Sequence, residues 1–210
     1  EGNEALNHLG ILKVKRTIIN SAFLAAALVT PIAASAVTLL NGSFESDPGV
    51  KSQGAAGGPH GRGRVFGNMP ISGASWGIWN DGVEGWTTGA QGVEFQTQRT
   101  LGLTPAGGLY YVELDTYRNS SITQDIFLSM GTYELSFAYS PRTNKPGDNG
   151  VSFGIAGLSG MITGPNADMP KREWTYVTRR FDVAVADTYS LNFAAAGTSN
   201  SLGGFVDDVS

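Results

Sequence analysis

The sequence predicts an all-β domain, a two-sheet antiparallel β-sandwich, that follows a removable leader. Two observations lead to this fold class. Beyond residue 36, apolar and polar residues alternate in short runs, and Gly, Pro, Asn and Asp separate one run from the next. No apolar pattern with the helical period is evident in this part of the chain. Many short strands without crossover helices are typical of antiparallel sandwiches.

The N-terminal residues 13–36 have three parts: a basic start at Lys13, Lys15 and Arg16, an apolar run, and a small-residue motif that ends at Ala36. This order is that of a secretory signal peptide. The apolar run is shorter than the roughly 20 residues of a membrane span. We therefore expect an exported protein, extracellular or on the cell surface, without a membrane span in its mature part.

The remaining residues, 37–210, have the length of a single domain. Residues 1–12 are expected to be an upstream extension that is not native to the domain. A long Gly-rich loop is expected at 46–85, with a disordered first half at 47–64, because long loops are either functional or mobile. Since the sequence stops within its last expected strand, we expect the C-terminus to be truncated.

Alternation defines the expected strands and the core. Leu135, Phe137, Leu191 and Phe193 are expected to face inward, and essentially no helix is expected after Ala36. The expected strands are 37–44, 93–98, 109–114, 122–128, 133–139, 151–155, 177–185, 189–193 and 204–209.

Composition excludes several functions. Without residues 1–36 the chain keeps 16 acidic and 11 basic residues and no basic cluster, so a nucleic acid partner is not expected. The absence of cysteine excludes thiol catalysis and Cys-ligated zinc. The histidine His60 lies in the Gly-rich loop, where it could not be positioned for a catalytic triad.

Binding is the better-supported function, because exposed aromatic rings flanked by hydrogen-bonding side chains form ligand sites. Trp86, by contrast, is expected in the core, and Arg142 could instead form a local ion pair with Asp148 in its turn-rich loop. The expected ligand-binding residues are Trp76, Trp79, Glu94, Gln96, Tyr139, Arg142 and Asn144.

A catalytic function would require two carboxylates across a cleft, as in glycosidases. Glu94 and Glu113 are expected to be neighbours on adjacent strands. Both also occupy positions where ordinary strand alternation places polar residues. No catalytic residue is therefore predicted, and an enzyme that acts on glycosides is the least favoured function.

Several short motifs occur in order along the chain. They are Asn41-Gly42-Ser43-Phe44-Glu45, Gly85-Trp86-Thr87-Thr88, Gly92-Val93-Glu94-Phe95-Gln96, Tyr111-Val112-Glu113-Leu114-Asp115, Gly131-Thr132-Tyr133 and Gly203-Gly204-Phe205-Val206-Asp207-Asp208-Val209-Ser210. From about residue 41 to 210 the chain resembles the galactose-binding-like jelly rolls of carbohydrate-binding modules and of exported bacterial PEP-CTERM proteins. The sorting tail of the latter is not in the sequence.

The resemblance implies a jelly-roll sandwich that binds a carbohydrate or an exopolysaccharide. It also implies a structural calcium ion shared by Glu45 and Asp207, with Asp208 as the alternative ligand. Calcium takes several oxygen ligands, which carboxylates and backbone carbonyls supply. The alternatives are solvated carboxylates at the sheet edge and, for the whole protein, a structural cell-surface component without a discrete ligand. The sequence does not indicate an oligomeric state.

Overall fold

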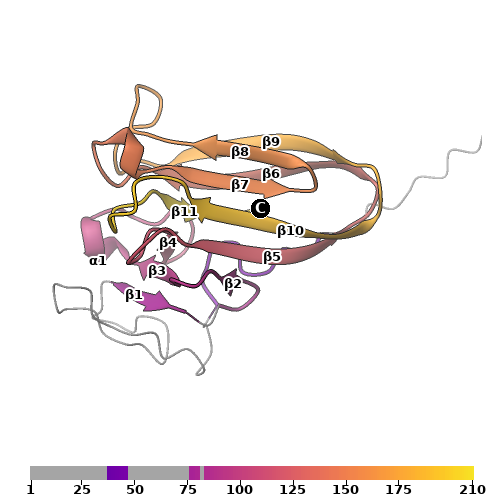
Figure 1. The fold of residues 1–210 in the computed structure, drawn as a ribbon, viewed down its shortest axis with the longest axis horizontal. Coiled ribbons are helices and arrows are strands. Elements are labelled where there is room, and N and C mark those ends of the chain that lie inside the picture. Colours follow the sequence, from indigo (N-terminus) through magenta and orange to yellow (C-terminus); the bar gives the residue numbers. More distant parts are fainter. Residues whose placement is uncertain (1–36, 47–75, 81–82) are drawn as a thin grey trace, which may run out of the picture. The chain divides into compact units, whose positions relative to one another are not determined.

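The computed structural model describes residues 37–46, 76–80 and 83–210, and the regular secondary structure of these residues is almost entirely β (Figure 1). Two antiparallel sheets of six and five strands pack face to face, so the predicted two-sheet sandwich is confirmed. The elements are β1 (Trp76–Trp79), β2 (Thr87–Thr88), β3 (Val93–Gln96), α1 (Gln98–Leu101), β4 (Tyr111–Glu113), β5 (Ser121–Leu128), β6 (Gly131–Ser140), η1 (Pro146–Asp148), β7 (Val151–Ile155), β8 (Leu158–Ile162), β9 (Thr175–Val183), β10 (Asp187–Ala195) and β11 (Phe205–Asp207).

The six-stranded sheet has the order β1-β3-β4-β11-β6-β9. Its last strand in the sequence, β11, therefore lies in the middle of the sheet. Phe205 is paired with Glu113 of β4 on one side and with Ser140 of β6 on the other. The sheet is complete only when these C-terminal residues are in place.

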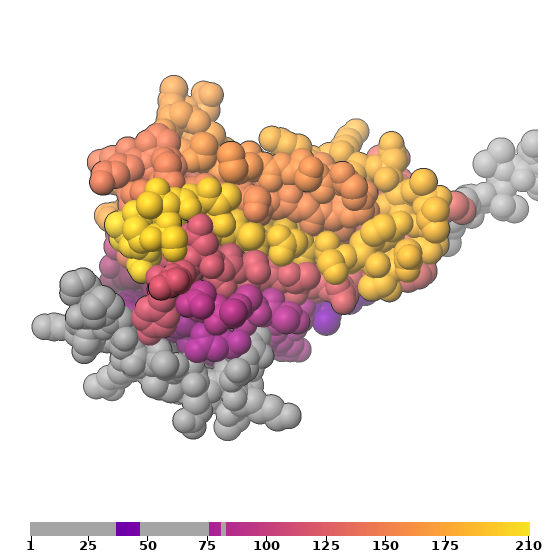
Figure 2. Space-filling view, viewed as in Figure 1, coloured from indigo at the N-terminus to yellow at the C-terminus, as the bar shows by residue number. Residues whose placement is uncertain are grey.

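The five-stranded sheet has the order β2-β5-β10-β7-β8. In the space-filling view its strands form adjacent bands, red for β5, yellow for β10 and orange for β7 and β8 (Figure 2). The pairing of β5 with β10 extends from Ser121 opposite Ala194 to Leu128 opposite Asp187. Strands far apart in the sequence are therefore held together by continuous ladders.

The core lies between the sheets and is rich in aromatic rings. Phe137 and Phe193, from opposite sheets, meet edge to face with ring centroids 5.0 Å apart. The predicted inward residues Leu135 and Leu191 are also buried, so that prediction is confirmed. Trp86 lies in the same core, as expected. Burial of this apolar surface is the main source of stability.

Several sequence expectations need correction. Residues 37–44 form no strand: Asn41 and Phe44 have positive φ, and the Phe44 N–H donates to the Asn41 carbonyl in a turn. The chain turns here because Phe44 must enter the core. The expected stripe 177–185 ends early, because β9 stops at Val183 and Val185 is exposed in the turn.

Two short helices, α1 and η1, interrupt the otherwise helix-free domain. The α1 helix begins where the Thr97 side chain accepts the Arg99 N–H, and it ends at Gly102, whose φ is 77°. The short strands β1, β2 and β8 were not predicted, because strands this short show little alternation.

The predicted extension 1–12, the signal peptide 13–36 and the disordered segment 47–64 lie outside the described residues and stay predictions. Among the described residues, no helix is both long and apolar enough to span a bilayer.

Replacing Phe193 tests the core. Phe193→Ala removes a fully buried ring, so we expect it to lower the free energy of unfolding by about 3–5 kcal/mol. Phe127→Ala, on the neighbouring sheet strand β5 but 61% exposed, should change it by no more than about 0.5 kcal/mol. Urea unfolding of both variants measures the difference. Equal losses would contradict the proposed core.

Candidate functional site

Polar side chains gather on the face of the six-stranded sheet that points away from the five-stranded sheet, which we call the outer face. Phe95 and Val112 are opposite each other in the ladder and belong to the core. Because side chains alternate along a strand, their neighbours Glu94 and Glu113 face outward and lie directly opposite each other. The expectation that these two carboxylates are neighbours is confirmed.

Gln96 joins the two carboxylates. Its Nε2 donates to Glu94 Oε1 at 2.7 Å and to Glu113 Oε2 at 2.8 Å. Its Oε1 accepts the hydroxyl of Tyr111 at 3.1 Å. Both hydrogens and the oxygen of the amide are therefore used, and the orientation of Gln96 is fixed.

Arg142 provides the positive charge of this site. Its Nη1 forms an ion pair with Glu113 Oε2, and the backbone N–H of Gly203 donates to Glu113 Oε1 at 2.6 Å. The alternative pairing of Arg142 with Asp148 is not formed, since the Asp148 carboxylate accepts the Thr143 hydroxyl instead. Glu94, Gln96, Glu113 and Arg142 together are the Glu94–Glu113 cluster.

The loop that carries Arg142 is held by Asn149, a residue that the sequence did not single out. The Asn149 side chain is buried, and its Oδ1 accepts the N–H groups of Arg142 and Thr143 at 2.9 and 3.0 Å. Its Nδ2 donates to the carbonyls of Gly164 and Lys145 at 2.7 and 2.9 Å. Asn149 thus fixes the backbone from which Arg142 reaches the sheet.

Burial dominates the electrostatics of the cluster. It raises the pKa of Glu94 to about 7, although Arg142 and the Gln96 amide act in the opposite direction. The pKa of Glu113 is also raised, first by burial and then by the charge of Glu94. Two carboxyls and one guanidinium in a poorly solvated place favour retention of a proton near neutral pH.

The predicted aromatic residues divide between the two faces of the sheet. Trp76 is opposite Gln96 in the ladder and is half-buried on the outer face. Trp79 and Tyr139 are buried in the core, so the prediction that they are exposed rings is wrong for both. Trp79 lies an odd number of positions from Trp76, which puts it on the opposite face of β1.

A second small apolar cluster covers part of the outer face next to the Glu94–Glu113 cluster. Tyr111 packs edge to face on Phe205, with centroids 4.9 Å apart, and on Trp174 at 5.6 Å. The half-buried Trp174 also donates its indole N–H to the Thr104 carbonyl at 2.7 Å. Sequence reasoning missed Trp174 and Tyr111, although outward alternation of Tyr111 with Glu113 could have indicated the latter.

Asn144 is exposed in the loop that follows Arg142. Within the described part of the chain it forms no hydrogen bond or ion pair with the Glu94–Glu113 cluster, and its role in binding stays a prediction. Of the seven expected binding residues, the structure brings Trp76, Glu94, Gln96 and Arg142 together on the outer face.

The predicted calcium ligands Glu45 and Asp207 hold one loop, 104–110, from two sides. The Glu45 carboxylate accepts two backbone N–H groups of this loop at 2.8 and 2.9 Å, and the Asp207 carboxylate accepts two others at 2.8 and 3.0 Å. Asp208 points elsewhere and accepts the Tyr176 hydroxyl at 2.7 Å. Glu45 and Asp207 are thus brought to the same loop.

Asp207 has the environment of a carboxylate that a cation would stabilise. It is fully buried, no Lys or Arg among the described residues is paired with it, and burial raises its pKa to about 7. The described residues contain no group of three or more His, Cys, Asp or Glu side chains placed to bind a metal. A calcium ion here would therefore depend on backbone carbonyls and water for its remaining ligands.

The Glu94–Glu113 pair does not have the arrangement of a glycosidase. Such enzymes hold two carboxyl groups apart, with the sugar between them. Here the amide of Gln96 lies between the carboxylates and bonds to both, and Glu113 has no exposed surface. Gln96 and Glu113 are instead held by their hydrogen bonds beneath the surface of the outer face.

Comparisons with known proteins found no matching family model and no matching curated protein. Among solved structures, the chain is similar to a CBM61 module in complex with β-1,4-galactotriose, with 16% identity, a TM-score of 0.46, and coverage of 61% of this chain and 88% of that chain. A family 35 carbohydrate-binding module from Clostridium thermocellum has 17% identity, a TM-score of 0.41, and coverage of 65% and 96%.

A CBM4 module is also similar, with 14% identity, a TM-score of 0.38, and coverage of 82% of this chain and 97% of that chain. Carbohydrate-binding modules, which the sequence resemblance named, therefore occur among the structural neighbours. With TM-scores and identities this low, the sandwich architecture rests on the strand pairing of this chain itself.

The raised pKa of Glu94 predicts a pH dependence of stability. The folded state binds this proton more tightly than the unfolded chain, in which the pKa is 4.5. Stability should therefore fall as the pH rises from about 4.5 to about 7. We expect Glu94→Gln, which cannot ionise, to reduce this fall and to melt above the wild type at about pH 8.

Melting temperatures across this pH range provide the measurement. Glu134→Gln is the matched control, because Glu134 is exposed on the same face and pairs with Arg180 at 3.1 Å. Its pH profile should follow that of the wild type. A Glu94→Gln profile parallel to the wild type would show that Glu94 titrates normally.

Proposed function

We propose that this protein is a non-catalytic module that binds carbohydrate on the outer face of its six-stranded sheet. The observation that carries the proposal is the half-buried indole of Trp76 on the same face as the Glu94–Glu113 cluster. Aromatic rings offer sugars a flat apolar surface, and fixed polar groups beside the ring supply directional hydrogen bonds.

The residues have distinct roles in this proposal. Trp76 stacks on a sugar ring, and the half-buried Glu94 and Arg142 make hydrogen bonds to hydroxyl groups. Gln96 and Glu113 are fully buried, and they hold those two groups in place from below. Because Gln96 and Glu113 are fixed by their own bonds, little side-chain entropy would be lost when the ligand binds.

We further propose that the module acts outside the cell, as the export signal expected at 13–36 implies. A secreted protein that still carried these residues would contradict this part of the proposal. An extracellular location would give the outer face access to exopolysaccharide.

Binding of the chain to a glycan array tests whether the protein recognises carbohydrate. We expect saturable binding to at least one glycan, and about tenfold weaker binding by Trp76→Ala, which corresponds to about 1.4 kcal/mol. Phe127→Ala, which removes a more exposed ring from the other sheet, is the control and should bind normally. The absence of binding together with self-association would favour a structural cell-surface component.

We also propose that Glu45 and Asp207 share a structural calcium ion. The support is the burial of Asp207 without a cationic partner and the convergence of both carboxylates on the loop 104–110. The ion would offset the charge of Asp207 and tie the start of the domain to its last strand.

Calcium should then stabilise the native state by mass action. At a free concentration about 100 times the dissociation constant the gain is about 2.7 kcal/mol. We expect a chelator to lower the melting temperature, and Asp207→Ala or Glu45→Ala to remove the difference between calcium and chelator. Asp168→Ala, at an exposed carboxylate, should keep that difference. If a chelator leaves the melting temperature of the wild type unchanged, Glu45 and Asp207 share no calcium ion and serve only to hold the loop 104–110.

A further inference from the structure

A second arginine lies beside the Glu94–Glu113 cluster. The backbone N–H of Arg172 donates to the Pro141 carbonyl at 2.8 Å, so Arg172 is adjacent in space to Arg142, the residue that follows Pro141. Arg142 is paired with Glu113. Arg172 is exposed, and within the described part of the chain its guanidinium forms no ion pair. Its charge is therefore available to a ligand.

The segment that carries Arg172 is anchored on the outer face. Two residues later, Trp174 packs edge to face on Tyr111, with centroids 5.6 Å apart. Its indole N–H donates to the Thr104 carbonyl at 2.7 Å. The backbone bond to Pro141 and the indole bond to Thr104 hold the segment at both ends. The position of Arg172 next to the ring of Tyr111 is thus fixed by its neighbours.

The charge of Arg172 acts on the Tyr111 hydroxyl. Burial raises the pKa of this hydroxyl most, and the carboxylates of Glu113 and Glu94 raise it further. The charges of Arg142 and Arg172 lower it. Of these four charged residues, Arg172 is the exposed one. A ligand on this part of the outer face would therefore meet the guanidinium of Arg172 first.

The same hydroxyl connects Arg172 to the aromatic part of the proposed carbohydrate site. The Tyr111 hydroxyl donates to Gln96, and Gln96 is opposite Trp76 in the ladder. Trp76, Gln96 and Tyr111 thus form one row across β1, β3 and β4. Two strand spacings separate the ends of this row, about 10 Å. A carbohydrate chain of more than one sugar can reach both the indole and the guanidinium.

Arg172 has a backbone conformation that is unusual for a residue with a side chain. Its φ is 59°, in the left-handed region where glycine is favoured. Residues held in such conformations cluster at sites that bind ligands. The chain thus has a long cationic side chain at a position where glycine would be less strained, which points to a role for the side chain itself.

The overall charge of the protein does not attract acidic ligands, because the net charge of the chain is −4. The attraction must therefore be local. Glu113 is fully buried and paired with Arg142. Glu94, whose pKa burial raises to about 7, keeps its proton below this pH. Repulsion of an acidic ligand by these two carboxyl groups is thereby reduced.

We propose, on the basis of the carbohydrate site proposed above, that the glycan is acidic and that Arg172 binds the carboxylate of a uronic acid residue. The planar guanidinium forms two parallel hydrogen bonds to a carboxylate, so it recognises both the charge and the shape of the group. Trp76 stacks on another sugar of the same chain. A neutral sugar offers Arg172 only hydroxyl groups, which form weaker bonds with it.

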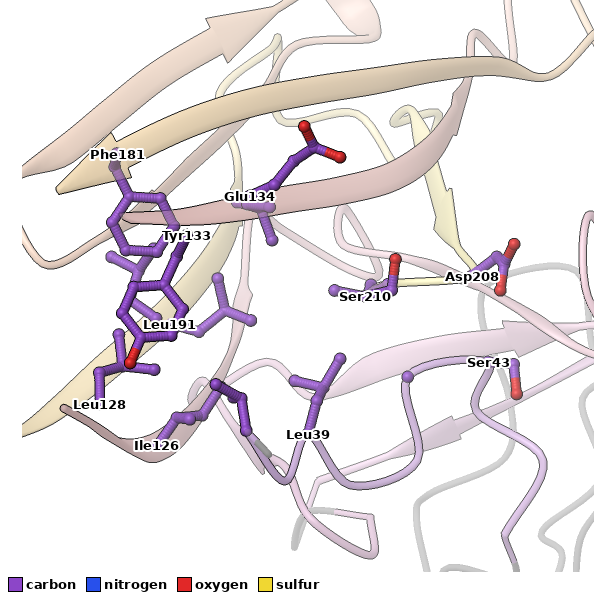
Figure 3. A pocket seen from close by; sticks show the side chains of 15 residues that line it. Leu39, Ser43, Ile126, Leu128, Tyr133, Glu134, Phe181, Leu191, Asp208 and Ser210 are labelled. Atoms are coloured by element: carbon purple, nitrogen blue, oxygen red, sulfur yellow. The ribbon is translucent and has the colours of Figure 1, made fainter. Parts of the chain in front are cut away.

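The cavity between the two sheets does not suit an acidic glycan. It has a volume of about 410 Å³, and its wall is mostly apolar, with Leu39, Ile126 and Leu128 among the lining residues (Figure 3). Its charged lining residues are Glu134 and Asp208, which are both acidic. Such a wall repels a carboxylate, so the proposed specificity belongs to the outer face.

The test uses a glycan array in which each uronic acid oligosaccharide is printed beside its carboxyl-reduced, neutral form. The array is probed at about pH 6, where Glu94 keeps its proton. We expect the acidic member of at least one pair to bind at least about tenfold more tightly than the neutral member. Sulfated forms of the neutral members are printed as well, and we expect them to bind more weakly than the uronates.

Two variants with the same change of charge locate the specificity. Arg172→Gln should weaken binding of the acidic member at least about tenfold and leave binding of the neutral member unchanged. Lys171→Gln removes the neighbouring exposed cation, and it should bind both members like the wild type. Arg172→Lys keeps the charge but loses the planar fork, so its affinity for the acidic member should lie between those of the wild type and Arg172→Gln.

Arg172→Gly separates a role in binding from a role in folding. Glycine adopts a φ of this kind without strain, so the variant should melt no lower than the wild type. It should nevertheless lose the preference for the acidic member, as Arg172→Gln does. A clear fall in the melting temperature, with the preference retained, would show that the side chain serves the fold.

Other outcomes would also overturn the proposal. Equal binding within each pair, or tighter binding of neutral or sulfated glycans, would refute the uronic acid specificity and leave the carbohydrate site intact. Equal losses in Arg172→Gln and Lys171→Gln would show that only the overall charge matters. Binding of no glycan on the array would refute the carbohydrate site itself and, with it, the role of Arg172.

Discussion

The position of β11 in the middle of the six-stranded sheet is the constraint on which the rest of the structure depends. Its three residues join β1, β3 and β4 to β6 and β9. The segment that leads into β11 also delivers the Gly203 N–H to Glu113 and two further N–H groups to the Asp115 carboxylate. The insertion that closes the sheet therefore also donates hydrogen bonds to the buried carboxylates of Glu113, on β4, and Asp115, just after it.

The carboxylates of Glu94 and Glu113 are costly to bury, and the structure offsets the cost only in part. Like charges directly opposite each other on neighbouring strands are unfavourable. Gln96, Arg142 and Gly203 supply hydrogen bonds and one positive charge. The pKa of Glu94 nevertheless stays near 7. A raised carboxyl pKa beside an indole on an accessible face is the arrangement on which the proposed carbohydrate site is based.

Sequence reasoning succeeded where a strand is long and one face is buried. In β6 and β10 alternation alone placed Leu135 and Phe193 inside, because a register shift would expose the whole apolar set. It failed for Trp79, since β1 is four residues long and follows a Gly-rich segment. Tyr139 could have been assigned correctly, because it shares a face with Leu135. The pairing of Arg142 with Glu113 could not, since it depends on β11 joining two distant parts of the chain.

The central place of β11 has a consequence for synthesis. A nascent chain emerges from its N-terminal end, and β4 and β6 are both available long before residues 205–207. Until then each presents an open edge where its neighbour is missing, and open edges invite pairing with other chains. Most neighbouring strands of this sheet are far apart in the sequence, and such long-range pairing slows folding. The six-stranded sheet can therefore close only when residues 205–207 are available, and their insertion is the closing step of its folding.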